Sequence, residues 1–144
     1  MVPIEEGGRT TLHPIHAILL AFPLALFASG LVSDIAYLRT EVIQWSNFSA
    51  WLITGALVFG GLTFAWAIIA AVFPHRTTRG RALAFLGAVA VMWIAGLINA
   101  FQHSHDAWAS VGALGLTLSI VSSLSALVAA AIGYSAQSVR AIVR

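Results

Sequence analysis

Residues 15–38 read IHAILLAFPLALFASGLVSDIAYL, a run of apolar side chains that few polar residues interrupt. A helix of about 20 such residues crosses the roughly 30 Å hydrocarbon layer of a bilayer. Three further runs, at about 48–73, 82–101 and 111–134, have the same character. They are continuously apolar and lack the alternation that is typical of barrel strands. The sequence therefore predicts an all-α integral membrane protein, with one domain over residues 1–144 that forms a four-transmembrane-helix bundle.

The composition supports this prediction. The chain is 60% hydrophobic and 8% charged, and its mean hydropathy is +0.93, far outside the range of a water-soluble domain. Its charges lie near the chain ends or in the short connections, apart from Asp34 near the end of the first run. The absence of cysteine excludes disulfides, thiolate metal sites and covalent c-type haem attachment. We expect the lipid bilayer to surround the helices, and we expect no nucleic acid as a partner.

The arginines predict an orientation for the four spans. Arg39 would lie on one side of the membrane and all the other arginines on the opposite side, namely Arg9, Arg76, Arg79, Arg81, Arg140 and Arg144. Because cytoplasmic segments carry the excess of Lys and Arg, both termini are expected in the cytoplasm. The protein would then be a multi-pass protein of the bacterial inner membrane.

Small and polar residues at helical spacing predict the contacts between the helices, because burial of apolar surface drives no association in lipid. The fourth run places Gly112, Gly115, Ser119, Ser122, Ala126, Ala129 and Gly133 on one stripe. The first aligns His13, His16, Leu20, Pro23, Phe27, Gly30 and Asp34, and the third aligns Phe85, Val89, Met92, Gly96, Asn99 and His103. For the second run, Thr54, Gly61 and Ala65 are the candidates. Pro23 should kink the first helix and free a carbonyl for a neighbour to bind.

One group of histidines is predicted at the cytoplasmic ends of the helices. His13 and His16 stand one turn apart at the start of the first run, and His75 ends the second at the same level. This spacing suits axial ligation of a haem iron by His16 and His75, with His13 as a further cofactor-binding residue. A second interpretation stays open, in which all three are hydrated interfacial histidines without a ligand.

A second polar group is predicted at the opposite ends. Asp34 and Tyr37 end the first run, Asn99 and His103 end the third, and His105 and Asp106 follow. A helix from residue 16 to residue 34 is about 27 Å long, so the two groups lie near opposite membrane faces. His103 and His105 suit weak metal binding or proton exchange with a quinone headgroup. The alternative is that Asp34 bonds to Asn99 or His103 as a tie between helices.

The opening residues also indicate a family. The stretch from His13 to Pro23, HPIHAILLAFP, resembles the HPxH and FP signature of a bacterial membrane family known as domain of unknown function 2231. Asp34, the Asp106-Ala107-Trp108 triplet and the Gly133-Tyr134 ending are similar too. The resemblance implies association with redox proteins, because similar domains occur beside c-type cytochromes, Rieske proteins and quinoprotein dehydrogenases. Relatives often carry a histidine just before the FP pair, where this chain has Ala21.

Two functions remain in competition at this point. The first is a small membrane subunit of an electron-transfer or dehydrogenase assembly, which binds b-type haem or quinone and docks onto a larger membrane complex, a periplasmic dehydrogenase or a cytochrome. The alternative is a cofactor-free structural or assembly subunit. No hydrolase or phosphate-binding motif is present, so no catalytic residue is assigned and a self-contained enzyme is not expected.

Overall fold

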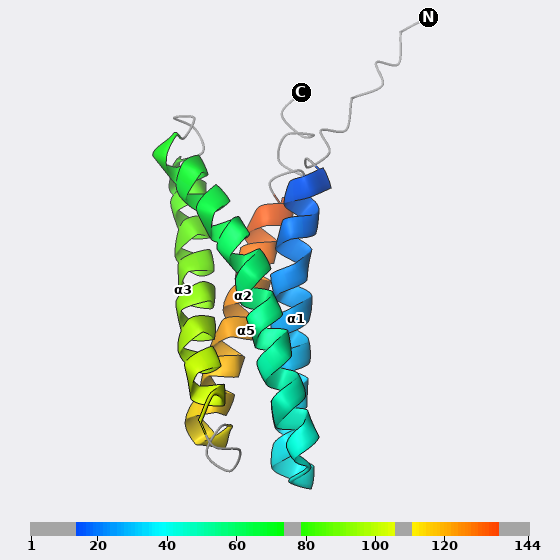
Figure 1. The fold of residues 1–144 in the computed structure, drawn as a ribbon. Helices are drawn as coiled ribbons and strands as arrows, with labels where there is room; N and C mark the ends of the chain where they lie inside the picture. Colours follow the sequence, from blue (N-terminus) through cyan, green and yellow to red (C-terminus); the bar gives the residue numbers. More distant parts are fainter. Residues whose placement is uncertain (1–13, 74–78, 106–110, 136–144) are drawn as a thin grey trace, which may run out of the picture.

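The computed structural model describes residues 14–73, 79–105 and 111–135, and it confirms an all-helical fold (Figure 1). Four helices are long and apolar enough to cross a membrane, as the sequence predicts. They are α1 (Pro14–Thr40), α2 (Ile43–Val72), α3 (Arg79–His103) and α5 (Gly112–Ser135). The second helix begins at Ile43, earlier than the expected start near residue 48. Its first turns include the polar residues Gln44 and Asn47, so they do not form a continuous apolar run.

The helices form a four-sided bundle in which chain neighbours are also neighbours in space. α1 and α3 each pack against both α2 and α5, so α1 and α3 lie on one diagonal of the bundle. Figure 1 shows α2 passing from beside α1, where those two helices are joined, to beside α3 at the other end. We call the end of the bundle where α1 and α3 finish the Asp34 end, and the opposite end the His16 end.

The link between α1 and α2 is very short. The N–H of Glu41 donates to the carbonyl of Tyr37 at 2.7 Å, and Glu41 has a φ of 56°. A residue in the left-handed region directly after a helix is the usual way to end it while satisfying a terminal carbonyl. This stop fixes the beginning of α2 next to the last turn of α1.

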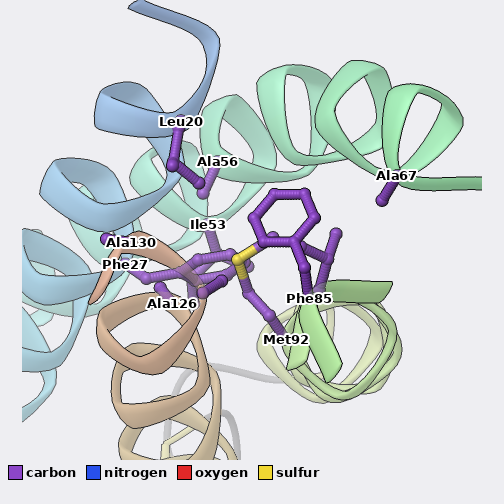
Figure 2. Packing of buried hydrophobic residues seen from close by; sticks show 11 residues of the cluster. Leu20, Phe27, Ile53, Ala56, Ala67, Phe85, Met92, Ala126 and Ala130 are labelled. Carbon is purple, nitrogen blue, oxygen red and sulfur yellow. The ribbon is translucent and has the colours of Figure 1, made fainter. Parts of the chain in front are cut away.

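The interior of the bundle is filled by a cluster of apolar side chains from all four helices, among them Leu20, Phe27, Ile53, Met92 and Ala126 (Figure 2). Phe27 is 1% exposed and reaches across the diagonal to α3. A Cβ atom at Gly96 would lie only 2.5 Å from Cζ of Phe27, so the ring needs a glycine opposite it. Large apolar side chains elsewhere face outward, where lipid would cover them.

The stripes predicted for three of the helices are largely the buried faces. In α1 the stripe is buried from Leu20 to Asp34, and in α3 all six of its residues are buried. In α5 the stripe is buried from Gly115 to Ala129, while Gly112 is exposed and Gly133 is intermediate.

The stripe predicted for α2 was wrong. Thr54 and Ala65 are exposed and Gly61 is only partly buried, and the buried face consists of Ser46, Ser49, Ile53, Ala56, Gly60, Thr63 and Ala67. Small residues occur on both sides of this helix, as the adjacent pair Gly60 and Gly61 shows. Residue size alone therefore did not identify the contact face of α2. That face also includes the large residue Ile53, which a search for small residues passes over.

Pro23 has the predicted consequence for its neighbours. A proline inside a helix leaves the carbonyl four residues earlier without its N–H donor, and here that carbonyl belongs to Leu19. The hydroxyl of Thr63 in α2 lies 2.9 Å from that oxygen and 3.0 Å from the carbonyl of Phe59 in its own helix. A neighbouring helix thus supplies the missing donor, as hydrocarbon surroundings require.

Candidate functional site

A buried hydrogen-bonded cluster joins three helices at the Asp34 end. Asp34 of α1 is 0% exposed, and one of its oxygens, Oδ1, lies 2.9 Å from Nε2 of His103 in α3. The other oxygen, Oδ2, accepts a hydrogen bond from the hydroxyl of Ser119 in α5. Because α1 and α3 lie on a diagonal, the link from Asp34 to His103 crosses the interior of the bundle.

Asn99 extends this cluster along α3. Its Nδ2 donates to the hydroxyl oxygen of Ser119 at 2.7 Å, so Asn99 reaches Asp34 through Ser119. The backbone carbonyl of Asn99 lies 3.0 Å from Nδ1 of His103. Its side-chain oxygen, Oδ1, is buried and has no hydrogen-bond partner in the described part of the chain. We call Asp34, Asn99, His103 and Ser119 the buried polar cluster.

A pocket of about 280 Å³ adjoins the cluster at this end of the molecule. It lies between the first turns of α2 and the end of α3, and its lining consists of Ile43, Gln44, Ser46, Asn47, Ala50, His103 and His105. Most of these side chains are polar. His103 is the one residue that belongs both to the pocket wall and to the buried polar cluster.

The His16 end is arranged differently. The imidazole of His16 is partly buried, and its ring centre lies 5.5 Å from that of Trp66 in α2 and 5.9 Å from that of Phe85 in α3. Its Nδ1 is buried, with no hydrogen-bond partner among the described residues. His16 is therefore held by aromatic rings, whereas His103 is held by hydrogen bonds.

Other polar side chains at the His16 end bind backbone carbonyls. The hydroxyl of Tyr134 donates to the carbonyl of Ala17 at 2.9 Å and so joins α5 to α1. The guanidinium of Arg81 in α3 donates to the carbonyl of Ile132 and, at 2.9 Å, to the hydroxyl of Ser135. A cation at the C-terminal end of α5 also interacts favourably with the helix dipole.

The structure brings together only part of the predicted site. Asp34, Asn99 and His103 meet, and His105 lies on the pocket wall beside them. His13, His75 and Asp106 lie outside the described residues, so the proposed pairing of His16 with His75 stays a prediction. Among the residues of 14–73, 79–105 and 111–135, no group of three or more His, Cys, Asp or Glu side chains is placed to hold a metal ion.

Sequence reasoning missed two parts of this end. Ser119 was assigned only to the packing stripe of α5, although it is the residue that joins Asn99 to Asp34. The pocket residues of α2, such as Gln44 and Asn47, lie before the expected start of the second run near residue 48. A polar residue at the Asp34 level of an otherwise small and apolar stripe is the signal that would have found Ser119.

Comparison with known proteins identifies a family but no characterised relative. No curated protein and no solved structure matches this chain. The family model described as "Predicted membrane protein (DUF2231)" matches residues 12–142, nearly the whole chain. Together with four membrane-spanning helices, this match shows that the chain belongs to that family of predicted multi-pass membrane proteins.

Proposed function

We propose that this protein is a non-catalytic membrane subunit of an electron-transfer or dehydrogenase assembly, and that it binds a quinone headgroup in the pocket at the Asp34 end. The observation that carries the proposal is that His103 forms the pocket wall and is hydrogen-bonded to Asp34. A quinone takes up protons together with electrons, so its site needs an acid–base group at the ligand. Electrons would come from a redox partner in the assembly.

The pocket and its surroundings suit a lipid-soluble ligand with a polar head. Its volume of about 280 Å³ is close to the lower limit of small-molecule sites, about 300 Å³. The polar side chains of Gln44 and Asn47 are available to bind the ring oxygens. One turn after Asn47, Trp51 is exposed on α2 and offers an apolar surface for an isoprenoid tail.

Photolabelling tests the quinone site. The full-length protein in lipid nanodiscs would be irradiated with an azido-benzoquinone that carries a short isoprenoid tail, and labelled peptides would be identified by mass spectrometry. We expect labelling within residues 43–50 and 103–105, and competition by unlabelled quinone. His103→Gln should reduce it at least several-fold. The matched control, His16→Gln at the other end, should leave it unchanged, and equal labelling of the two variants would contradict the proposal.

A b-type haem at the His16 end is the second ligand we propose, with His16 and His75 as the ligands of its iron and His13 as a further cofactor-binding residue. Two observations support it, since His16 has an unpartnered ring nitrogen and packs against Trp66. When bound, a haem would add one-electron transfer at this end. A reduced-minus-oxidised optical spectrum of protein purified from cells with ample haem tests this. A spectrum without Soret or α-band change would refute it.

We also propose that both termini lie in the cytoplasm, so that the Asp34 end faces the periplasm and a periplasmic dehydrogenase or cytochrome. The distribution of arginines supports this orientation. The chain has no cysteine, so a single introduced thiol reports its own side of the membrane. Thr40→Cys should react with a membrane-impermeant maleimide added to spheroplasts, and Gly80→Cys should not. The reverse pattern would overturn the orientation.

The rival function is a cofactor-free assembly subunit. It is favoured by the observation that the bond between Asp34 and His103 also ties α1 to α3. In that case quinone labelling would stay at background in the parent and in His103→Gln, and His103→Gln would only lower the free energy of unfolding. Copurification of the native membrane complex, with and without His103→Gln, would show whether loss of the tie releases a partner.

A further inference from the structure

The geometry fixes the number of protons that Asp34 and His103 share. A backbone carbonyl can only accept, so Nδ1 of His103, at 3.0 Å from the carbonyl of Asn99, must carry a hydrogen. The contact of 2.9 Å between Nε2 and Oδ1 of Asp34 also needs one hydrogen. It sits either on the nitrogen, opposite a carboxylate, or on the oxygen, opposite a neutral ring. In both forms the pair holds one proton more than a carboxylate with a neutral imidazole, and its net charge is zero.

A neutral pair is what this location permits. Asp34 is 0% exposed, and a lone carboxylate at that depth would be costly. Among the described residues, the other titratable groups at this end are Tyr37, which is buried on the same face of α1, and the exposed Arg39, Glu41 and His105. On the helices that pack around Asp34, α5 offers serines and α2 offers Ser46 and Ser49, none of which ionises near neutral pH.

Ser119 and Asn99 can bind Asp34 in either protonation state. With Asp34 ionised, the Asn99 amide donates to Ser119, and Ser119 donates to Oδ2, as the structure shows. With the shared proton on Oδ1, Oδ2 is the carbonyl oxygen of a carboxylic acid and still accepts from Ser119, so neither bond has to change.

We propose that the buried polar cluster is a proton-exchange site, loaded and emptied through the pocket, in which Ser119 and Asn99 are positioning residues. In the step itself, the hydrogen bond from Nε2 of His103 to Asp34 opens, the Nε2–H bond breaks, and the proton forms an O–H bond on an oxyanion of the pocket ligand. The net charge of the pair falls from zero to minus one, and the ligand loses its negative charge. A water molecule at the pocket mouth then returns a proton to the pair and leaves as hydroxide. The use of this proton on a quinone rests on the proposed function, but the proton site itself does not.

Histidine NMR on the full-length protein in nanodiscs, without added quinone, tests the proton count. Nitrogen-15 labelling of all histidines, with His103 assigned by its loss in His103→Gln, shows which ring nitrogens carry hydrogen. We expect a protonated Nδ1 at neutral pH and a hydrogen between Nε2 and Asp34. Infrared spectra compared with Asp34→Asn show how much of that hydrogen resides on the carboxyl. A bare Nδ1 beside an ionised Asp34 would overturn the proposal.

Two variants separate positioning from mere packing. Ser119→Ala should keep the shared proton and shift the infrared band of Asp34, because Oδ2 loses its donor. Ser122→Ala is the matched control, since Ser122 is also buried on α5 but donates to the carbonyl of Leu118 in its own helix. It should leave the band unchanged. Equal shifts in both variants would overturn the role of Ser119, and thermal unfolding of each variant confirms that it is folded.

Exchange with the pocket is measured by transfer of magnetisation from water to the His103 ring hydrogens. We expect measurable exchange in the parent protein, and slower exchange in Asn47→Trp, which narrows the pocket mouth. An exchange rate that is the same in Asn47→Trp and in the parent protein would show that the pocket is not the proton route. Addition of a short-chain benzoquinone then tests the ligand separately. If the His103 hydrogens exchange with water but their signals do not shift on addition of the quinone, the proposed function is refuted and the proton site is retained.

Discussion

The two ends of the bundle solve the problem of polar side chains in a membrane protein in opposite ways. At the Asp34 end, Asp34, His103, Ser119 and Asn99 bind one another across three helices. At the His16 end, Arg81 and Tyr134 bind backbone carbonyls, and His16 keeps a buried nitrogen without a partner. Mutual hydrogen bonding makes the first end a single cooperative unit, although Oδ1 of Asn99 has no partner among the described residues. The unsatisfied nitrogen makes the second end one that gains if a ligand binds.

The largest effect is expected from breaking the pair at the Asp34 end. Asp34→Ala leaves His103 without its partner in the interior, and loss of one member of a buried pair costs about 3 kcal/mol of unfolding free energy. Unfolding by denaturant in bicelles measures this. The double variant Asp34→Ala with His103→Leu should be little worse than the single one, because the two residues act as one unit. Additive losses would show that the two side chains do not depend on each other.

The middle of the bundle, which the two ends share, is expected to be intolerant of added volume at one glycine. Gly96→Val places atoms against the buried ring of Phe27 and should cost about 2 kcal/mol through overpacking. Gly87→Val in the same helix is the matched control, because no atom lies within 4 Å of a Cβ at Gly87. Similar unfolding curves for the two variants would mean that Phe27 can move aside.

A smaller loss should follow from removing the hydroxyl that serves the carbonyl freed by Pro23, nearer the His16 end. Thr63→Val leaves the Leu19 carbonyl without a donor and should cost about 1 kcal/mol. Thr54→Val is the control, since Thr54 is exposed and donates to the carbonyl of Ala50 in its own helix. Adding Pro23→Ala to Thr63→Val should recover part of the loss, because alanine returns the missing N–H. A further loss instead would contradict this account of Pro23 and Thr63.

Sequence reasoning reached the fold more completely than the site. Continuous apolar runs and stripes of small residues depend on local spacing, and they predicted four helices and most of the buried faces. It also grouped Asp34, Asn99 and His103, since each ends a span at the same membrane level. It did not find Ser119 as the link, because hydrogen-bond partners depend on how helices rotate about their axes. The same rotation determines that Ile53 and Thr63, and not Thr54, face inward along α2.

The smallest effect, and the one whose sign matters most, concerns His16. His16→Phe removes an unpartnered buried nitrogen while keeping a ring against Trp66 and Phe85, so the unfolding free energy should stay constant or rise by up to about 1 kcal/mol. His103→Phe should lower it, because Asp34 then lacks its partner.

These opposite signs hold for protein without haem. If haem is bound through His16, the stabilisation that a ligand gives to the folded state is lost in His16→Phe, and both variants become less stable than the parent. Unfolding of the parent and of His16→Phe, each prepared with and without haem supply, therefore compares the two ends directly. A loss of stability in His16→Phe that depends on haem supply would make the His16 end a ligand site. A loss without haem would mean that its imidazole has a hydrogen-bond partner outside the described residues.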